Sequence, residues 1–533
     1  MILLTPFFIF LIPFIYFVKF NEVPMLHPEF FALLGSIVIV SLLSSLALYR
    51  ASWVRLSLAL SILIVFSLSF LPEFQSGVPL KIAFFLVLVL AIQLREKTLP
   101  FFCMIAGICC MATLVFSVGH QFNAVTISEK PVNSNPDLPP YIHIIFDEYM
   151  GVDAIPTNIG QGQALQNEIK TLFPAYGFRL FTHAYSRYSR TYDSIPNLLN
   201  FTPKSQDGYY FPGGFSKQIL TENKDFELIS KMGYKIRVYQ PDYIDFCHAK
   251  GADYSYCYTY PVYSFKAFYH LNFPWTARYP YLLKSYLLSS FIYQNALYDY
   301  VYTIRPLAAK IKIYLPDYPW DQNQLSSLNT LVALEQLKED VIQHSNDGSA
   351  FFAHILLPHS PYIYDENCQI HSNPMDWLIN YDFGPQGNTP ERRVLRYQLY
   401  ENQLQCLSKS LKTVLDTWQT TGVMKNAIII IQGDHSSRLP VISPTIENEG
   451  VCSWQDFNDA YPALFAIKAP FYFAGLDNAR YSLTYLFGQV SEQISHTQFP
   501  IDNNNDFVYL TDAVPGLRVN QVIEPLSAFI AAS

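Results

Sequence analysis

The chain has 533 residues, which is too long for one ordinary domain and predicts two or three parts. Charged residues make up only 15% of the sequence, whereas a soluble protein of this size carries about a quarter. The net charge is −8 and no basic run occurs, so a nucleic-acid partner is not expected.

The shortage of charge is concentrated in residues 1–120, which we expect to form a transmembrane domain. The first apolar run has no basic residues before it and no small-residue cleavage site after it, so it predicts a retained anchor. Basic residues border the second and fourth connections, and the positive-inside rule then puts everything after residue 120 outside the cytoplasm. Five apolar runs have about membrane-spanning length, at residues 2–18, 31–48, 54–71, 79–94 and 99–118.

The cysteines after residue 120 agree with an oxidising compartment. Cys247 and Cys257 bracket a tyrosine-rich turn, and Cys368 and Cys406 flank a polar loop. Either pair could form a disulfide outside the cytoplasm. No CxxC motif occurs, so a thiolate zinc finger is not expected.

A polar, proline-punctuated stretch at 121–140 predicts a linker, and residues 141–533 predict a soluble domain. Strand and helix patterns alternate in this domain, which indicates an α/β fold with a mostly parallel sheet covered by helices on both faces. Strands are expected at 141–146, near 178–185, and at 235–239, 350–357, 427–431 and 461–467. Helices are expected near 161–175, from Thr191, and near 216–232, 327–345 and 389–420.

Metal-binding side chains follow two of the most apolar strands. The strand expected at 427–431 ends just before Asp434 and His435, and another strand runs directly into Asp147 and Glu148. In open α/β sheets, ligands bind beyond the carboxyl ends of the strands. Asp and His at these positions are good ligands for zinc or manganese. The alternative is that both pairs are solvated loop residues.

A candidate nucleophile is Thr191, which lies where an irregular loop gives way to a short apolar helix. A hydroxyl there lies among free backbone N–H groups at the positive end of the helix dipole, a setting that suits phosphate. A divalent cation lowers the pKa of a bound hydroxyl and makes it a better nucleophile. The alternative is a plain N-cap threonine.

A histidine between two prolines is a further candidate. His359 follows the strand expected at 350–357, where the chain turns into a loop. Its imidazole could donate to a substrate oxygen, protonate a leaving group or bind a second metal. The alternative is a structural loop histidine.

Taken in chain order, these motifs resemble the alkaline phosphatase/sulfatase superfamily. Five membrane helices before such a domain are similar to the phosphoethanolamine transferases of lipopolysaccharide and the lipoteichoic acid synthases, and the Thr-x-x-Ser-Ile-Pro pattern resembles the transferases in particular. The resemblance extends over roughly residues 141–470. The motifs that carry it are Asp147-Glu148, Thr191 with Ser194-Ile195-Pro196, His359-Ser360-Pro361-Tyr362 and Asp434-His435.

The resemblance implies an alkaline phosphatase-like fold and a sulfatase-like enzyme, a phosphotransferase above all. Thr191 would be the nucleophile and become phosphorylated, and His359 would face the substrate. A Zn²⁺ or Mn²⁺ ion would be bound by Asp434, His435 and Thr191. Asp147, Glu148 or both would complete the ligand set.

The resemblance also implies partners and a location. A membrane phospholipid would donate a phosphoethanolamine or phosphoglycerol type of headgroup to a glycan or lipid acceptor. The protein would be a multi-pass monomer of a bacterial plasma (inner) membrane, with its catalytic domain on the periplasmic or extracytoplasmic side. Two alternatives stay open: a phosphatase, phosphodiesterase or other sulfatase-like hydrolase on the same site, and a binding or scaffold protein that has lost the chemistry.

The sequence also departs from the family pattern. No Cys/Ser-x-Pro-x-Arg motif occurs, so a formylglycine sulfatase is not expected. Ser436 replaces the usual glycine after Asp-His. No histidine follows His435 until His496, which leaves open whether the site holds one metal ion or two.

Overall fold

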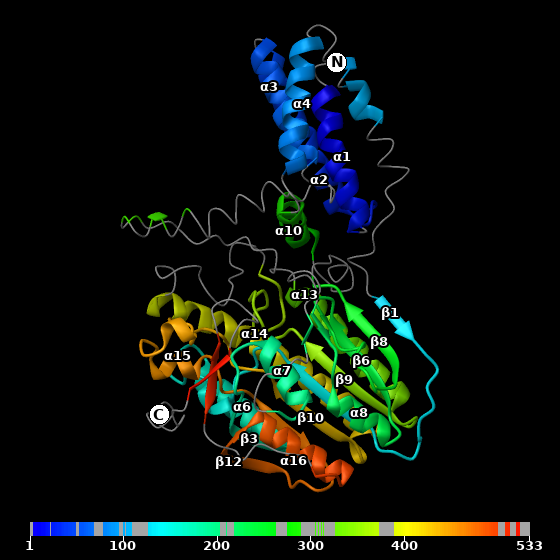
Figure 1. The fold of residues 1–533 in the computed structure, drawn as a ribbon, viewed down its shortest axis with the longest axis vertical. Coiled ribbons are helices and arrows are strands. Elements are labelled where there is room, and N and C mark those ends of the chain that lie inside the picture. The colour runs from blue at the N-terminus through cyan, green and yellow to red at the C-terminus, as the bar shows by residue number, and fades with distance from the viewer. Residues whose placement is uncertain are drawn as a thin grey trace. The chain divides into compact units, whose positions relative to one another are not determined.

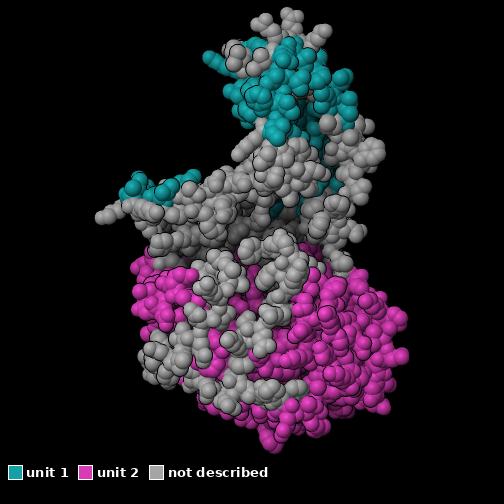
Figure 2. Space-filling model, viewed as in Figure 1, with its two compact units in different colours: residues 1–124, 263–322, 372–375 teal, residues 125–262, 323–371, 376–533 magenta. Residues whose placement is uncertain are grey.

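The residues of the computed structural model group into two compact units (Figure 2). The first comprises residues 1–124, 263–322 and 372–375, and the second comprises residues 125–262, 323–371 and 376–533. The structure describes residues 4–21, 23–49, 53–68, 78–94, 100–101, 103–108, 126–202, 209–210, 218–262, 274–288, 304, 307–308, 311, 313, 326–371, 389–498, 507–511 and 519–522.

The first unit is built from apolar helices. Its core joins α1, α3 and α4 through Ile9, Leu60 and Ala91. Helix α10 packs against α2, and an ion pair joins them, with Arg278 Nε 3.0 Å from the buried Glu29 Oε1. The helices are α1 (Leu4–Phe20), α2 (Pro28–Tyr49), α3 (Trp53–Leu68), α4 (Val78–Leu94) and α10 (Trp275–Leu288).

Membrane-spanning length is reached by one helix among the residues that the structure describes, over Pro28–Leu46. Three further apolar helices, Thr5–Lys19, Arg55–Leu68 and Ile82–Ala91, are shorter. Most of the run at 99–118 lies outside the described residues. The arrangement of five spans therefore stays a prediction.

The second unit is organised around a mixed sheet in which nine strands are described (Figure 1). Their order is β1-β8-β6-β9-β2-β10-β11-β3-β12. The pairs β1–β8, β10–β11 and β11–β3 are antiparallel and the other neighbours are parallel, so the sheet is mostly parallel, as predicted. The strands are β1 (Thr126–Glu129), β2 (Tyr141–Phe146), β3 (Arg179–Tyr185), β6 (Lys235–Pro241), β8 (Tyr254–Tyr260), β9 (Ser349–Ile355), β10 (Ile428–Gly433), β11 (Phe465–Lys468) and β12 (Gly475–Ser482).

Two smaller sheets accompany the large one. The first joins β4 (Tyr209–Tyr210), β5 (Gln218–Leu220) and β7 (Ile244–Asp245). The second pairs β13 (Val508–Thr511) with β14 (Val519–Val522). Short 3-10 helices lie at Val152–Ala154, Val423–Lys425 and Ile446–Asn448.

Helices cover both faces of the large sheet. On one face, Ile195 of α7, Phe226 of α8 and Phe487 of α16 join a single apolar core with the strands. On the other face, α6, α13 and α14 pack together, and Trp418 Nε1 of α14 donates to the Lys338 carbonyl of α13 at 3.2 Å. These helices are α6 (Gly162–Ala175), α7 (Thr191–Leu199), α8 (Lys224–Lys231), α13 (Ser326–His344), α14 (Pro390–Thr420) and α16 (Leu483–Ser495), and a short α15 spans Trp454–Asn458.

Three segments differ from the sequence-based expectation. The helix expected near 216–232 is shorter, because the Asn223 side chain accepts a hydrogen bond from Phe226 N and caps α8 there, while Gln218–Leu220 form β5. The tyrosine-rich segment expected as a turn continues into β8, and the expected linker includes β1, which pairs with β8. Aromatic and β-branched residues favour pleated structure, which accounts for β8.

Both cysteine pairs that the sequence singled out are disulfides. Cys247 bonds Cys257 and Cys368 bonds Cys406. The first joins β8 to the loop after β7, and the second ties α14 to the loop that follows β9.

Candidate metal centre

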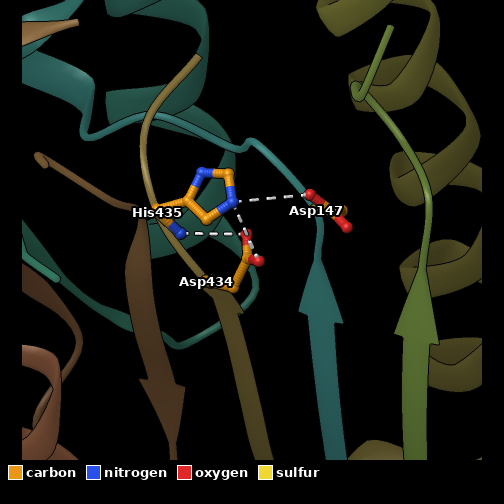
Figure 3. Close-up of side chains that lie close together, drawn as sticks. All are labelled: Asp147, Asp434 and His435. Atoms are coloured by element: carbon orange, nitrogen blue, oxygen red, sulfur yellow. Dashed lines mark hydrogen bonds and ion pairs between the residues drawn. The ribbon is translucent and has the colours of Figure 1, made fainter. Parts of the chain in front are cut away.

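The register of the central strands brings the predicted metal ligands to one place. Gly433 of β10 pairs with Phe146 of β2, so Asp434 and Asp147 follow at the same edge of the sheet. Figure 3 shows their side chains and that of His435 pointing toward one another. A Cβ atom on Gly433 would lie 2.1 Å from the Tyr149 carbonyl oxygen, so only glycine lets the two strand ends approach this closely.

His435 presents a lone pair to this cluster. Its Nδ1 lies 2.9 Å from the Ser436 carbonyl oxygen, which can only accept a hydrogen bond. The proton therefore sits on Nδ1, and Nε2 is left as an acceptor. Nε2 faces Asp434 Oδ2 at 3.3 Å and Asp147 Oδ1 at 3.8 Å.

The atoms that converge here are acceptors with too few donors. Asp147 Oδ1 and Asp434 Oδ2 are buried and have no hydrogen-bond partner among the residues that the structure describes. One oxygen from each carboxylate and the His435 nitrogen all lie within 4.8 Å of one another. Two carboxylates and an imidazole lone pair repel one another unless a cation lies between them, so these residues fit a divalent metal ion.

Burial and the mutual influence of these groups shift the pKa values in the cluster. Burial raises the pKa of Asp434 to about 7, and the charge of Asp147 adds to the effect. Burial works in the same direction on Asp147, but the histidines around it hold its pKa below the ordinary value. Burial lowers the pKa of His435 to about 3, so its imidazole is neutral at pH 7. A neutral imidazole is the form that binds metals.

Thr191 lies directly against this cluster. Its Oγ1 is 3.4 Å from Asp147 Oδ2 and 3.3 Å from His435 Nε2. The N-cap of α7 is Arg190, and Thr191 is the first helical residue. Its hydroxyl therefore faces the acidic cluster, which does not agree with the alternative of a plain N-cap threonine.

Two side chains that were not predicted from the sequence lie against Asp147. Its Oδ2 lies 3.2 Å from His354 Nε2 and accepts a hydrogen bond from the Tyr243 hydroxyl at 3.4 Å. These groups and Thr191 gather around Oδ2, which leaves Oδ1 to face His435. His354 is the next-to-last residue of β9, and its place at a strand end was the one signal that could have identified it.

Glu148 belongs to the same edge but faces a different group of side chains. Its backbone has φ +64°, and its N–H donates to Asp434 Oδ1 at 3.0 Å. Its Oε1 lies 3.5 Å from His359 Nε2 and 3.6 Å from Arg438 Nη1. Burial raises the pKa of Glu148 above its ordinary value, while Arg438 opposes that shift.

A second set of metal-type ligands overlaps the first. One ligand atom each of Asp147, Glu148 and His359 also lie within 4.8 Å of one another. The structure thus brings together all six side chains that the sequence predicted for the site. The set of Asp147, Asp434 and His435 can hold a cation next to the Thr191 hydroxyl. The set of Asp147, Glu148 and His359 includes a partly exposed imidazole that can meet a substrate.

Solved structures resemble the chain at low identity. The C-terminal periplasmic domain of EcEptC from Escherichia coli in complex with Zn is 11% identical, with 74% of this chain and 95% of that chain covered and a TM-score of 0.39. The phosphonate monoester hydrolase of Agrobacterium radiobacter is 10% identical, with 70% of this chain and 80% of that chain covered and a TM-score of 0.41. The lipoteichoic acid synthase LtaP from Listeria monocytogenes is 10% identical, with 75% of this chain and 85% of that chain covered and a TM-score of 0.36. Similarities of this size do not assign an activity to the chain.

A comparison with protein families gives a more specific result. No curated protein gave a significant match. Residues 161–463 match the family described as Sulfatase, which is more than half of the 533 residues. The matched range includes Thr191, His359, Asp434 and His435. With this match over the α/β unit, the chain belongs to the sulfatase family of enzymes, within the alkaline phosphatase/sulfatase superfamily.

Proposed function

We propose that this chain is a metal-dependent phosphotransferase of the membrane surface. It moves a phosphoethanolamine or phosphoglycerol type of headgroup from a phospholipid to an extracytoplasmic glycan or lipid, through a phospho-threonine at residue 191. The observation that carries the proposal is the contact of Thr191 Oγ1 with Asp147 and His435, at 3.4 and 3.3 Å.

The identity of the nucleophile favours phosphorus chemistry over sulfate-ester hydrolysis by formylglycine. Formylglycine is an aldehyde and requires a cysteine or serine precursor, because oxidation of a threonine would give a ketone. The residue against the cluster is Thr191, and no Cys/Ser-x-Pro-x-Arg motif occurs in the chain. A threonine hydroxyl can still form a phosphoester, as other hydroxyl nucleophiles do.

Two in-line displacements account for the transfer. In the first, Thr191 Oγ1 attacks phosphorus, the bond from phosphorus to the diacylglycerol oxygen breaks, and that oxygen ends with the proton that Thr191 loses. In the second, an acceptor hydroxyl attacks the same phosphorus, the bond to Thr191 Oγ1 breaks, and Thr191 regains a proton. The His359 side chain is 23% exposed and its Nε2 lies near Glu148, so it can supply or take these protons at the solvent side.

The cation would be held by the buried set of Asp147, Asp434 and His435. When bound, a divalent ion lowers the pKa of a neighbouring hydroxyl and offsets negative charge on phosphoryl oxygens. One imidazole nitrogen with carboxylate oxygens is a donor set that suits zinc or manganese.

The location outside the cytoplasm rests on two features. The disulfides Cys247–Cys257 and Cys368–Cys406 are typical of an oxidising compartment. The helix over Pro28–Leu46 has the length and apolar character of a membrane span. They support a transmembrane part at 1–120, a linker at 121–140 and a catalytic part at 141–533 on the periplasmic side of a bacterial inner membrane.

The test is mass spectrometry of the purified protein after incubation with labelled phospholipid. We expect the peptide that contains Thr191 to gain the mass of one headgroup phosphate, and Thr191→Ala to lose both the adduct and turnover. Adding candidate glycan or lipid acceptors should release the label as a modified acceptor. Release as free headgroup phosphate, with or without acceptors, would assign a hydrolase instead. An unmodified Thr191 with unchanged turnover in Thr191→Ala would reject both enzymes.

A further inference from the structure

An arginine lies immediately before the candidate nucleophile. Arg190 is the N-cap residue of α7, with extended φ −140° and ψ 140°, and its side chain makes no capping bond. Its Nη1 is buried and has no hydrogen-bond partner among the residues that the structure describes. Asp193, in the first turn of α7, attracts Arg190. A buried guanidinium nitrogen without an acceptor costs free energy that a bound anion would recover.

A second arginine approaches the same place from another strand end. Arg438 follows Asp434 by four residues and has φ +54°, a left-handed conformation that is rare outside glycine. Its Nη1 lies 3.6 Å from Glu148 Oε1, and its side chain is 31% exposed. After burial, the proximity of Arg438 is the largest influence on Arg190, and it lowers the pKa of that group. Arg190 directly precedes the candidate nucleophile and Arg438 faces Glu148 at the same sheet edge, so an anion bound at this edge would meet two positive charges.

We infer that Arg190 and Arg438 form an anion site beside Thr191 that binds the non-bridging oxygens of the phosphoryl group under attack. The inference rests on the proposed function, and it adds two residues and the chemistry of their ligand. A guanidinium presents several N–H donors in one plane, which matches two oxygens of a phosphate. Negative charge on those oxygens is spread and stabilised by positive groups during in-line transfer, so the pair would act on rate as well as on binding.

The experiment measures the affinity of the full chain for inorganic phosphate by titration calorimetry, with zinc or manganese bound. The variants are Arg190→Gln and Arg438→Gln, and the matched control is Arg179→Gln. Arg179 starts β3 and bonds Asp477. Both β3 and β10 pair antiparallel with β11, so β3 runs in the direction of β10 and its start lies at the sheet edge opposite the site. We expect each site variant to weaken phosphate binding by about 10- to 100-fold and the control to leave it unchanged.

Thermal unfolding separates this role from a structural one. The Nη1 of Arg190 has no acceptor among the described residues, so its removal should leave the Tm of Arg190→Gln unchanged or raise it, and Arg190→Lys should recover part of the phosphate affinity. A lower Tm with wild-type phosphate affinity would assign Arg190 to the fold and overturn the inference, as would wild-type affinity in both variants. If the site variants bind phosphate more weakly but the wild-type protein transfers no headgroup, the proposed function is wrong and the anion site is still supported.

Discussion

The site has an inner and an outer half that share Asp147 and differ in their exposure to solvent. In the inner half, Asp147, Asp434 and His435 are at most 1% exposed, and their facing atoms are acceptors. In the outer half, the buried Glu148 meets His359 and Arg438, whose side chains are 23% and 31% exposed. The buried acceptors of the inner half fit a cation, whereas the partly exposed imidazole and guanidinium of the outer half can meet a substrate. In the proposed function, the inner half would therefore bind the metal and the outer half would meet the substrate.

The largest effect is expected from the inner half. Asp434→Asn keeps the size of the side chain but removes one charge that faces His435. We expect metal affinity to fall by more than about 100-fold and headgroup transfer to fall below detection, because a direct ligand contributes more than its outer neighbours do. Calorimetric titration with zinc and manganese measures the first effect. Asp477→Asn, a change on the edge strand β12, is the control, and metal binding of wild-type strength in Asp434→Asn would contradict the division.

The outer half should respond differently. We expect His359→Gln to slow transfer by about 100-fold or more, the usual contribution of a general acid or base, while metal affinity stays within a few-fold of wild type. Metal content measured on the same samples is decisive here. If the substitution reduces the content from two ions to one, the outer half also binds a cation and the two halves are alike.

A smaller effect is expected from the residues that lie against Asp147 without belonging to either half. His354→Asn removes the imidazole that lies 3.2 Å from Asp147 Oδ2, so the carboxylate is held less firmly. We expect metal affinity to fall by about 10- to 100-fold, as for other groups that orient a ligand. Tyr243→Phe removes only a 3.4 Å hydroxyl contact and should cost less. Equal metal affinities in wild type and His354→Asn would show that the orientation of Asp147 does not depend on this residue.

The smallest effect concerns a buried carboxyl away from the site. Burial raises the pKa of Asp225 to about 8, above the ordinary value of 3.8, so the folded protein keeps this proton over a range where the unfolded chain has lost it. Stability from this group is therefore lost as pH rises from about 4 to about 8. Asp225→Asn should raise the Tm by a few degrees at pH 8 and hardly at pH 4.5. A pH-independent difference in Tm would show that folding does not raise the pKa of Asp225.

The site residues that lie next to strong local patterns could be predicted from the sequence. The strand β10 is a run of isoleucines and β2 is almost as apolar, so both predict buried central strands, and their ends predict where Asp147 and Asp434 lie. His359 and Thr191 were also marked by their neighbours in sequence, a pair of prolines and the start of an apolar helix. Segments without such a pattern, such as 216–232, were placed less well.

The residues around these ligands could not be predicted in the same way. Tyr243 reaches Asp147 across 96 positions of sequence, and Arg438 meets Glu148 only because two strand ends are adjacent in the sheet. No local spacing encodes such a contact, because it depends on strand order and register.

The amino-acid sequence by itself determined which apolar runs are buried and which polar residues follow them, since that depends on local hydrophobic pattern. Strand order and register decided that Asp147 turns one oxygen to His354 and Tyr243 and the other to His435. They also decided that Arg190 and Arg438 lie close enough to interact. The physical reason is that pattern sets burial residue by residue, whereas distances between side chains follow from how whole strands pair.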